Sequence, residues 1–236
     1  MNYKLSMSKF IALPSKANIL VSGQTQSGKS YFTAKLLMNC DQMFKEPPSL
    51  IIFCYKHFQN IYNDIEKTLG ERVKFRSTLP SEHELMEDIY KHRQTEQNSK
   101  GHIIFVADDW MDQLYRNPLF LALVTRIAHH ECLTNIFLTQ DGSTSGPLKK
   151  EIMNNIHVNV YMASCRDRAS LRSLAIMLAD YECIMESYDD ASKGGRGSYL
   201  MIVTHPESDP ALRYRSNIFP SDKYGPVIYK SKKHNF

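Results

Sequence analysis

Residues 19–37 read ILVSGQTQSGKSYFTAKLL: a short apolar run, a glycine-bounded loop, and then a stretch that suits a helix. The segment from Gly23 to Ser30 matches G-x-x-x-x-G-K-[ST], the phosphate-binding P-loop. Gly23 and Gly28 allow backbone turns that a Cβ would obstruct, so successive N–H groups can point at phosphate oxygens. A simple glycine-rich turn is the alternative, but the eight-residue match lies in the strand–loop–helix context that the motif requires. The stretch therefore predicts a nucleotide site.

The other residues of this loop have expected roles in holding the nucleotide. Lys29 is expected to reach the β- and γ-phosphates as a point charge, and the Ser30 hydroxyl is expected to ligate Mg²⁺. The N-terminus of the following helix adds a field that favours an anion. ATP and Mg²⁺ are therefore the expected ligands. The predicted nucleotide-binding residues are Gly23, Gln24, Thr25, Gln26, Ser27, Gly28, Lys29, Ser30 and Tyr31.

Length and composition predict a folded domain in a reducing, intracellular compartment. The chain has 236 residues, 42% hydrophobic and 23% charged, which suits one α/β domain with a sizeable core. No stretch approaches the roughly 20 uninterrupted apolar residues of a membrane helix, so no membrane partner is expected. The first residues lack the apolar core of a signal peptide. Five scattered cysteines predict neither a disulfide framework nor a zinc site, and the net charge of +4 is compatible with a polyanionic partner without requiring one.

A second motif ends an apolar run in the middle of the chain. Residues 101–110 read GHIIFVADDW, which predicts a buried strand followed by Asp108 and Asp109, a Walker B signature in form. The carboxyl end of a parallel strand lies where ligands bind in open α/β sheets. Asp108 is predicted to hold Mg²⁺ through its water shell, and Asp109 to act as a base or water-orienting carboxylate. Many ATPases use the longer Glu at that position, which leaves the location of the base open.

Further apolar runs predict the rest of a mainly parallel sheet. Strands are predicted over residues 50–55, 135–140, 156–162 and 199–204, with a brief extended piece at 73–75. Helices are predicted over 57–69, from a Ser81–Glu84 capping box to about residue 94, within 111–132, and from 165 to about 179. The 135–140 strand ends in Thr139 and Gln140, which either sense the γ-phosphate or simply begin a polar loop. The glycine-rich stretch 192–198 is interpreted as a hairpin or connector loop before the last strand.

Together the motifs resemble the FtsK–HerA superfamily. The resemblance is carried by residues 23–30, 103–109 and 135–140, in that order. Within the superfamily the sequence is similar to the genome-packaging ATPases of poxvirus-like and Maverick/Polinton-type double-stranded DNA viruses and elements. Residues 165–168, 199–204 and 212–220 are similar to the Maverick/Polinton members, and the likeness spans about residues 17–220. The P-loop is common to many families, so it is the combination and order of the motifs that narrows the resemblance.

The resemblance implies a three-layer α/β/α P-loop core with an additional strand between the two Walker strands. It implies a homo-oligomeric ring that hydrolyses ATP at subunit interfaces and threads double-stranded DNA into a preformed capsid, with a capsid vertex or portal protein as a further partner. The expected location is the cytoplasm or nucleus of a host cell, or the virion. The domain prediction is an N-terminal lead-in (1–16), a P-loop ATPase core (17–204) and an extended basic C-terminal tail (205–236).

The resemblance also suggests catalytic residues. Gln140 matches the polar sensor position, so the predicted catalytic set is Lys29, Asp109, Gln140 and an arginine finger. Such a finger reaches a pocket from outside it and stabilises charge on the γ-phosphoryl oxygens. No motif identifies it here: Arg126, before the sensor strand, is the first candidate, and Arg166 and Arg168 are the alternatives.

Two other functional classes stay open as alternatives. A P-loop kinase of a small substrate, such as a nucleoside, shares the phosphate loop, but it usually needs an arginine-rich lid and a substrate-binding acid near the second strand. Residues 56–60 offer no such acid. A nucleotide-dependent switch or scaffold would bind without turnover, and the intact Lys29, Ser30, Asp108 and Asp109 argue against an inactive site.

Overall fold

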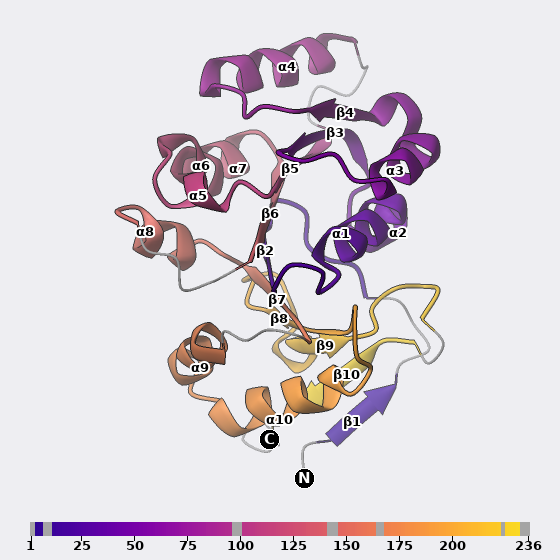
Figure 1. Ribbon diagram of the computed structural model, residues 1–236, viewed down its shortest axis with the longest axis vertical. Coiled ribbons are helices and arrows are strands. Elements are labelled where there is room, and N and C mark those ends of the chain that lie inside the picture. Colours follow the sequence, from indigo (N-terminus) through magenta and orange to yellow (C-terminus); the bar gives the residue numbers. More distant parts are fainter. Residues whose placement is uncertain are drawn as a thin grey trace.

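A single mixed β-sheet organises the chain (Figure 1). The computed structural model describes residues 3–6, 11–95, 101–140, 146–163, 168–222 and 225–231. Within them ten strands form one sheet, in the order β1-β10-β9-β8-β7-β2-β6-β5-β3-β4. The strands are β1 (Tyr3–Ser6), β2 (Asn18–Ser22), β3 (Pro48–Tyr55), β4 (Val73–Arg76), β5 (His102–Asp108), β6 (Leu133–Thr139), β7 (Val158–Met162), β8 (Tyr199–Val203), β9 (Tyr214–Ser216) and β10 (Val227–Lys230).

The six strands from β7 to β4 are parallel to one another. Helices cover both faces of this half, so its strands, apart from the edge strand β4, are mostly apolar. β6 lies between β2 and β5, with Val21 opposite Leu138 and Val106 opposite Ile136. β6, which ends in Thr139 just before Gln140, therefore separates β2, which leads into the P-loop, from β5, which ends in Asp108. This is the additional strand between the two Walker strands that the resemblance implies.

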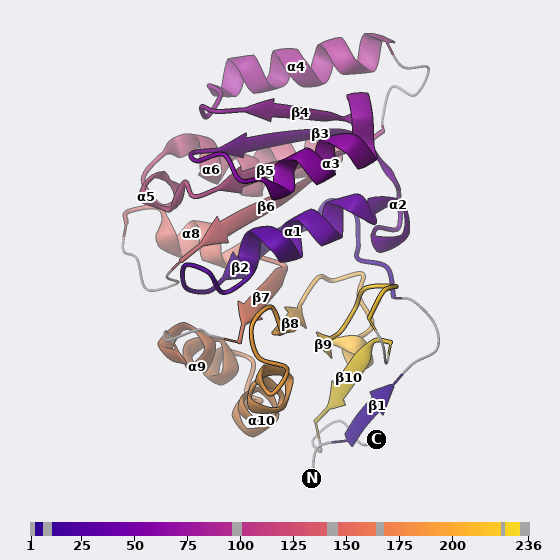
Figure 2. The ribbon, with the colours of Figure 1, turned by 45° about the vertical axis from the view of Figure 1, so that its right-hand side comes forward.

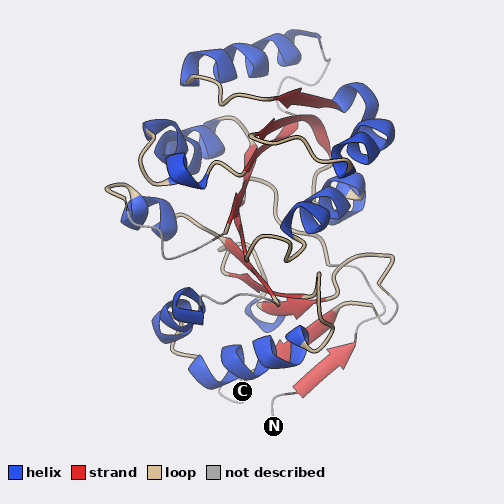
Figure 3. Ribbon diagram, viewed as in Figure 1, coloured by secondary structure: helices blue, strands red, loops and turns tan. Residues whose placement is uncertain are grey.

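Helices form a layer on each side of the sheet (Figures 2 and 3). One layer packs on Val21 and its same-face neighbours, and the other packs on Leu20 and its neighbours. The first layer contains α1 (Lys29–Met38), α2 (Cys40–Met43) and α3 (Ile61–Leu69). The second contains α4 (Glu82–Thr95), α5 (Met111–Leu114), α6 (Pro118–Ala122), the π-helical turn η2 (Leu123–Ile127), α7 (Ala128–His130), α8 (Lys149–Asn154), α9 (Arg168–Met177) and α10 (Tyr181–Ser192).

This arrangement confirms the predicted three-layer α/β/α fold with a mainly parallel sheet. The capping box of α4 is also confirmed: the Ser81 N–H donates to Glu84 Oε2 at 2.6 Å, and the Glu84 N–H donates to Ser81 Oγ at 3.2 Å. Two short 3₁₀ turns complete the described elements, η1 (Gly70–Arg72) and η3 (Pro210–Leu212). None of the helices in the described ranges has the length and apolarity needed to cross a membrane.

A buried asparagine pair explains the π-helical turn in the second layer. Asn135 Nδ2 donates to Asn18 Oδ1 at 2.7 Å and to the Leu123 carbonyl at 3.0 Å. Asn18 Nδ2 donates to the Val124 carbonyl at 2.9 Å. A π turn displaces carbonyls from the regular helical ladder. Here the amides of Asn18, the first residue of β2, and of Asn135, opposite it in β6, donate hydrogen bonds to two of those carbonyls. The helix is therefore fastened to the sheet at the edge opposite the P-loop.

The last strands extend the sheet in antiparallel fashion. β8 pairs with β7, β9 with β8, β10 with β9, and β1 with β10. Ile218 and Phe219 are 2% and 3% exposed, and the Phe219 ring lies 5.3 Å from that of Phe32 in α1. The predicted C-terminal tail is thus extended in its backbone but packed into the fold. Leu13 of the predicted lead-in is also fully buried.

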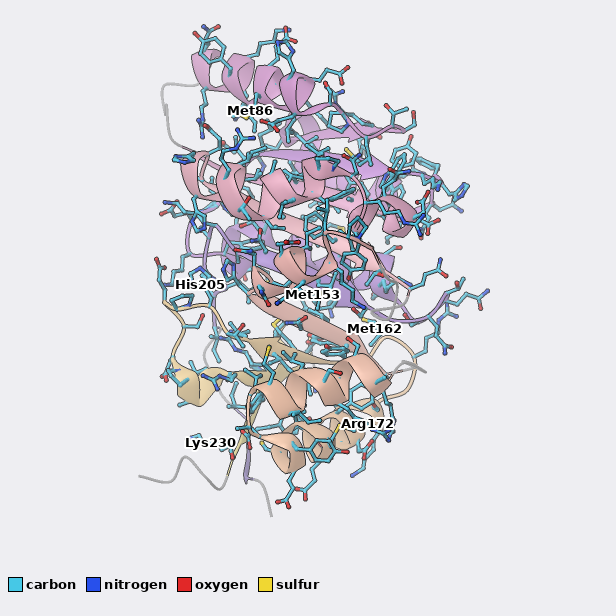
Figure 4. All side chains as sticks on the ribbon, turned by 90° about the vertical axis from the view of Figure 1, so that its left-hand side faces the viewer. Met86, Met153, Met162, Arg172, His205 and Lys230 are labelled. Atoms are coloured by element: carbon cyan, nitrogen blue, oxygen red, sulfur yellow. The ribbon has the colours of Figure 1, made fainter. Side chains whose placement is uncertain are left out.

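His157 immediately precedes β7, at the sheet edge away from the P-loop. Figure 4 labels Met162, the last residue of this strand, and, well apart from it, His205, whose ring lies 4.9 Å from that of His157. The backbone N–H of Asn18 donates to His157 Nδ1 at 3.1 Å. Burial, with the fields of His205 and His129, lowers the pKa of His157 to about 4.

We expect the free energy of unfolding to fall as the pH drops from about 6.5 to about 4. In that window the unfolded chain protonates His157 while the folded chain does not, so protons favour unfolding. His157→Gln should flatten the slope, by at most about 1.4 kcal/mol per pH unit, in urea titrations at several pH values. His130→Gln, an exposed control, should leave the slope unchanged. Equal slopes for the parent and His157→Gln would contradict the prediction.

Candidate nucleotide-binding site

The P-loop connects β2 to α1 at the carboxyl edge of the parallel strands. Its first residue is anchored to the sensor strand, because the Gly23 N–H donates to the Thr139 carbonyl at 3.1 Å. A Cβ at Gly23 would lie 2.6 Å from Ser27 Oγ and 2.7 Å from Met162 Cβ, so no side chain fits there. Helix α1 begins at the other end of the loop, where the Phe32 N–H donates to the Gly28 carbonyl at 2.8 Å. The sheet thus holds the loop from two strands, β6 and β7.

The Lys29 ammonium is folded back into the loop. Its Nζ donates to the carbonyls of Gly23 and Gln24 at 2.7 and 2.9 Å, and the residue is only 9% exposed. These contacts hold a positive charge at the concave side of the loop, beside the N-terminus of α1. A positive charge and a helix N-terminus at one place favour an anion, so this position suits the role predicted for Lys29.

Asp108 receives three hydrogen bonds on one oxygen. The donors to its Oδ2 are Tyr62 OH at 2.6 Å, Ser30 Oγ at 3.0 Å and Gln59 Nε2 at 3.4 Å. Burial raises the pKa of Asp108, while the hydrogen bonds from Tyr62 and Ser30 oppose that rise. The pKa of the Tyr62 hydroxyl is raised by burial and by the negative charge of Asp108. The buried carboxylate is therefore placed by α3 as well as by β5.

The predicted metal ligands Ser30 and Asp108 lie together. Their side-chain oxygens are 3.0 Å apart, and both line the nucleotide pocket. Hydroxyl and carboxylate oxygens are the hard ligands that Mg²⁺ takes, usually one or two per site beside substrate phosphates. Burial disfavours the ionised form of Asp108, and a cation nearby would stabilise that form. The donor set therefore fits Mg²⁺.

Asp109 and Gln140 form a second polar group beside the first. Gln140 Nε2 donates to Asp109 Oδ1 at 3.3 Å, and Thr25 Oγ1 of the P-loop donates to Gln140 Oε1 at 3.0 Å. Asp109 has a φ of +65°, in the left-handed region that Asp tolerates better than most residues. His57 Nε2 lies 3.8 Å from its other oxygen. Gln140 thus bridges the P-loop to the second acid.

These groups surround one cavity of about 390 Å³, within the size range of small-molecule sites. The prediction included nine of its lining residues, and Gly23, Gln24 and Ser27 form the loop behind it. The remaining lining residues were not predicted as site residues. They are Gln59, Ile61, Leu138 and Arg196.

Two of the candidate arginines, Arg126 and Arg168, are not among the described residues that line this cavity. Arg126 is paired with Glu82 at 2.7 Å and follows Val124, whose carbonyl contacts Asn18 at the opposite edge of the sheet. Arg168 begins α9 and is paired with Asp189 at 2.8 Å. Arg166 falls outside the described residues. An arginine finger serves a neighbouring subunit, so the choice among the three stays a prediction.

Removing the Tyr62 hydroxyl should destabilise the protein. In Tyr62→Phe the carboxylate of Asp108 loses its shortest hydrogen bond in a buried setting, at a cost of about 1–2 kcal/mol in the free energy of unfolding. Urea denaturation followed by circular dichroism measures this change. Tyr55→Phe is the matched control, because Tyr55 belongs to the same aromatic cluster (ring centroids 5.5 Å from Tyr62). An equal effect of both substitutions would contradict the assigned role.

Comparison with known proteins supports the fold. No protein-family model matches the chain, and no curated protein matches it. Among solved structures, it is similar to B204, the DNA-packaging ATPase from Sulfolobus turreted icosahedral virus, with 12% identity, coverage of 93% of this chain and 99% of that one, and a TM-score of 0.55. It is also similar to the genome-packaging NTPase B204 from Sulfolobus turreted icosahedral virus 2, in complex with ATPγS. The identity is 12%, the match covers 92% of this chain and 98% of that one, and the TM-score is 0.55.

A third similar structure is the cytoplasmic domain of the type VII secretion ATPase EccC from Thermomonospora curvata. The identity is 12%, the match covers 91% of this chain and 25% of that one, and the TM-score is 0.50. At such identities the likeness establishes the P-loop NTPase fold and assigns no role to a residue. The roles of the site residues depend on the geometry above.

Proposed function

We propose that this protein is an ATP-hydrolysing translocase of double-stranded DNA that packages a viral or virus-like genome into a capsid. One observation carries the proposal: the carboxyl ends of β5 and β6 bring Asp108, Asp109 and Gln140 onto the P-loop, in one cavity with Lys29. Two of the similar structures are packaging enzymes of viruses, which supports the assignment. In this proposal the chain is a packaging ATPase of the FtsK–HerA type, related to those of poxvirus-like and Maverick/Polinton-type elements.

The proposed reaction is hydrolysis of the terminal phosphoanhydride of ATP. The P-loop N–H groups and Lys29 bind the phosphates, and Lys29 stabilises the charge that develops on the γ-phosphoryl oxygens. Asp109 takes a proton from a water molecule whose oxygen attacks the γ-phosphorus, as the bond to the β–γ bridging oxygen breaks and leaves ADP. Gln140 orients that water and holds Asp109. Mg²⁺, held by Ser30 and Asp108, would supply charge neutralisation on the phosphates.

The hydrogen bonds of Gln140 suggest how the γ-phosphate is sensed. Its amide joins Thr25 of the P-loop to Asp109, so a change in the phosphates that moves either partner also moves the end of β6. In the proposed ring the arginine finger comes from a neighbouring subunit, with Arg126 as first candidate and Arg166 and Arg168 as alternatives. DNA is gripped through its backbone, and a capsid vertex or portal protein is the docking partner. The enzyme works inside the host cell, in its cytoplasm or nucleus, or in the virion.

The test is steady-state ATP hydrolysis by the purified protein with and without long double-stranded DNA, together with its mass in solution with ATP. The proposal predicts stimulation by DNA of any sequence, a steep loss of stimulation as salt rises, and a ring-sized assembly. A monomer that hydrolyses ATP without response to DNA, and that phosphorylates a nucleoside in a panel of acceptors, would identify a kinase instead. Binding of ATP without any turnover would identify a switch.

A further inference from the structure

The glycine-rich loop between α10 and β8 lies directly on the P-loop. The Gly197 N–H donates to the Ser27 carbonyl at 3.2 Å, and a Cβ at Gly28 would lie only 3.0 Å from Gly197 Cα. The loop then enters β8, where the Ala163 N–H donates to the Ser198 carbonyl at 2.9 Å. Figure 2 shows this loop rising from α10 toward the phosphate loop. Residues about 170 positions apart in the sequence thus form one wall of the nucleotide site.

This loop carries an arginine into the cavity. Arg196 is exposed and lines the cavity together with Lys29 and the two acids of β5. Gly195 and Gly197 flank it with φ values of +75° and +86°, which side-chain-bearing residues rarely adopt. The Ser198 hydroxyl donates to the Gly195 carbonyl at 2.6 Å and closes the turn. The backbone on either side of Arg196 is therefore set by the loop itself.

The charges around Arg196 favour a phosphate ligand. Its neighbour Lys193 is paired with Asp190 at 3.2 Å, whereas Arg196 forms no salt bridge within the described part of the chain. A guanidinium presents several N–H groups in a planar fork that matches phosphate oxygens. Lys29 and Arg196 are the two cations among the described lining residues. A polyphosphate between them would contact both.

We infer that Arg196 binds the terminal phosphates of the nucleotide held by its own P-loop, in cis. The inference follows from the position of the loop: Gly197 is seated on Ser27 and Gly28, next to Lys29, and Arg196 lines the same cavity as Lys29. This role differs from that of an arginine finger, which comes from another subunit. The inference depends on the proposed ATP-binding function, and it adds a residue to that site.

Nucleotide affinity tests the inference. ATPγS and AMP are titrated by calorimetry into the parent, Arg196→Ala, Arg196→Lys and the control Lys193→Ala, which removes a cation from the same loop outside the cavity. Arg196→Ala should weaken ATPγS binding by about 10- to 100-fold and leave AMP binding within about twofold. Arg196→Lys should lose less, since it keeps the charge without the fork. Lys193→Ala should match the parent.

The same titration separates cis from trans contact and tests the two proposals independently. It is done at a protein concentration where the mass in solution is that of one chain. Loss of ATPγS affinity there supports contact in cis, and loss that occurs only in assemblies overturns it. Equal losses for ATPγS and AMP would overturn the assignment to the terminal phosphates. If the parent binds ATPγS and Arg196→Ala binds equally well, the inference alone fails; if the parent binds no nucleotide, the proposed function fails. Unchanged thermal unfolding shows that each variant is folded.

Discussion

Lys29→Ala is expected to abolish ATP hydrolysis and leave the protein folded. The Lys29 ammonium is held by the Gly23 and Gln24 carbonyls at the concave side of the P-loop, where the phosphates of a bound nucleotide would lie. Alanine removes the charge that we propose stabilises the transferring phosphoryl group, and we expect kcat/KM to fall by about 10³-fold or more. The loop itself keeps its anchors, since the hydrogen bonds from Gly23 to Thr139 and from Phe32 to Gly28 are backbone contacts.

The measurement is phosphate release over a range of ATP concentrations, which gives kcat/KM, with thermal unfolding as a check on the fold. Lys45→Ala is the matched control: Lys45 is half-exposed, lies outside the cavity and is paired with Glu207 at 3.4 Å. It should hydrolyse ATP at the parent rate. Retained turnover in a folded Lys29→Ala protein would remove Lys29 from the site and reopen the nucleotide assignment.

Asp109→Asn should preserve ATP binding and stop hydrolysis. Asparagine has the same shape and also tolerates the left-handed backbone of this position, and its side-chain oxygen can still accept from Gln140. It cannot take a proton from water. We therefore expect kcat to fall by about 10²- to 10⁴-fold, with the dissociation constant for ATPγS within about threefold of the parent value.

Single-turnover hydrolysis and calorimetric binding measure these two quantities. Asp112→Asn provides the same chemical change three residues further on, at an exposed carboxylate paired with Lys56, and should have the parent kcat. Unchanged turnover in Asp109→Asn would move the base elsewhere. His57 and Gln140, the neighbours of Asp109, would then be the next positions to replace.

The parallel half of the fold and its acids could be predicted from the sequence because local signals mark them. Buried parallel strands such as β5 and β6 are continuous apolar runs, and each ends in polar residues at the same edge. The P-loop is a contiguous motif. Once strand direction is known, Lys29, Ser30, Asp108 and Gln140 must converge, and the structure places them together.

The elements that were missed lack such local signals. Helix α10 buries Cys183, Ile184, Ser187 and Tyr188, so a serine interrupts the apolar stripe by which an amphipathic helix is detected. The short strands β9 and β10 join the sheet through backbone hydrogen bonds at its edge, for which side-chain periodicity is a weak guide. Prolines close to these strands, such as Pro220 and Pro226, favour the prediction of an extended tail over residues 205–236.

The missed site residues depend on contacts between distant segments. Tyr62 is a core residue of α3, and its hydroxyl reaches Asp108 across 46 positions of sequence. Arg196 lies in a loop whose glycines read as a connector. Only the packing of Gly197 on Gly28 shows that this connector borders the nucleotide cavity. No motif spacing reports such a contact.

The reversal of direction between β7 and β8 has a consequence for how this site can change. At the carboxyl edge of the sheet, a parallel strand is followed by a segment that must also lead into a crossover helix. Because β8 runs the other way, the segment that precedes it arrives at the same edge, with a helix already complete behind it. Residues can be added or lost there without shifting the register of any strand that carries an acid. The segment before β8 is therefore where the wall of the cavity can change while the acids of β5 stay in place.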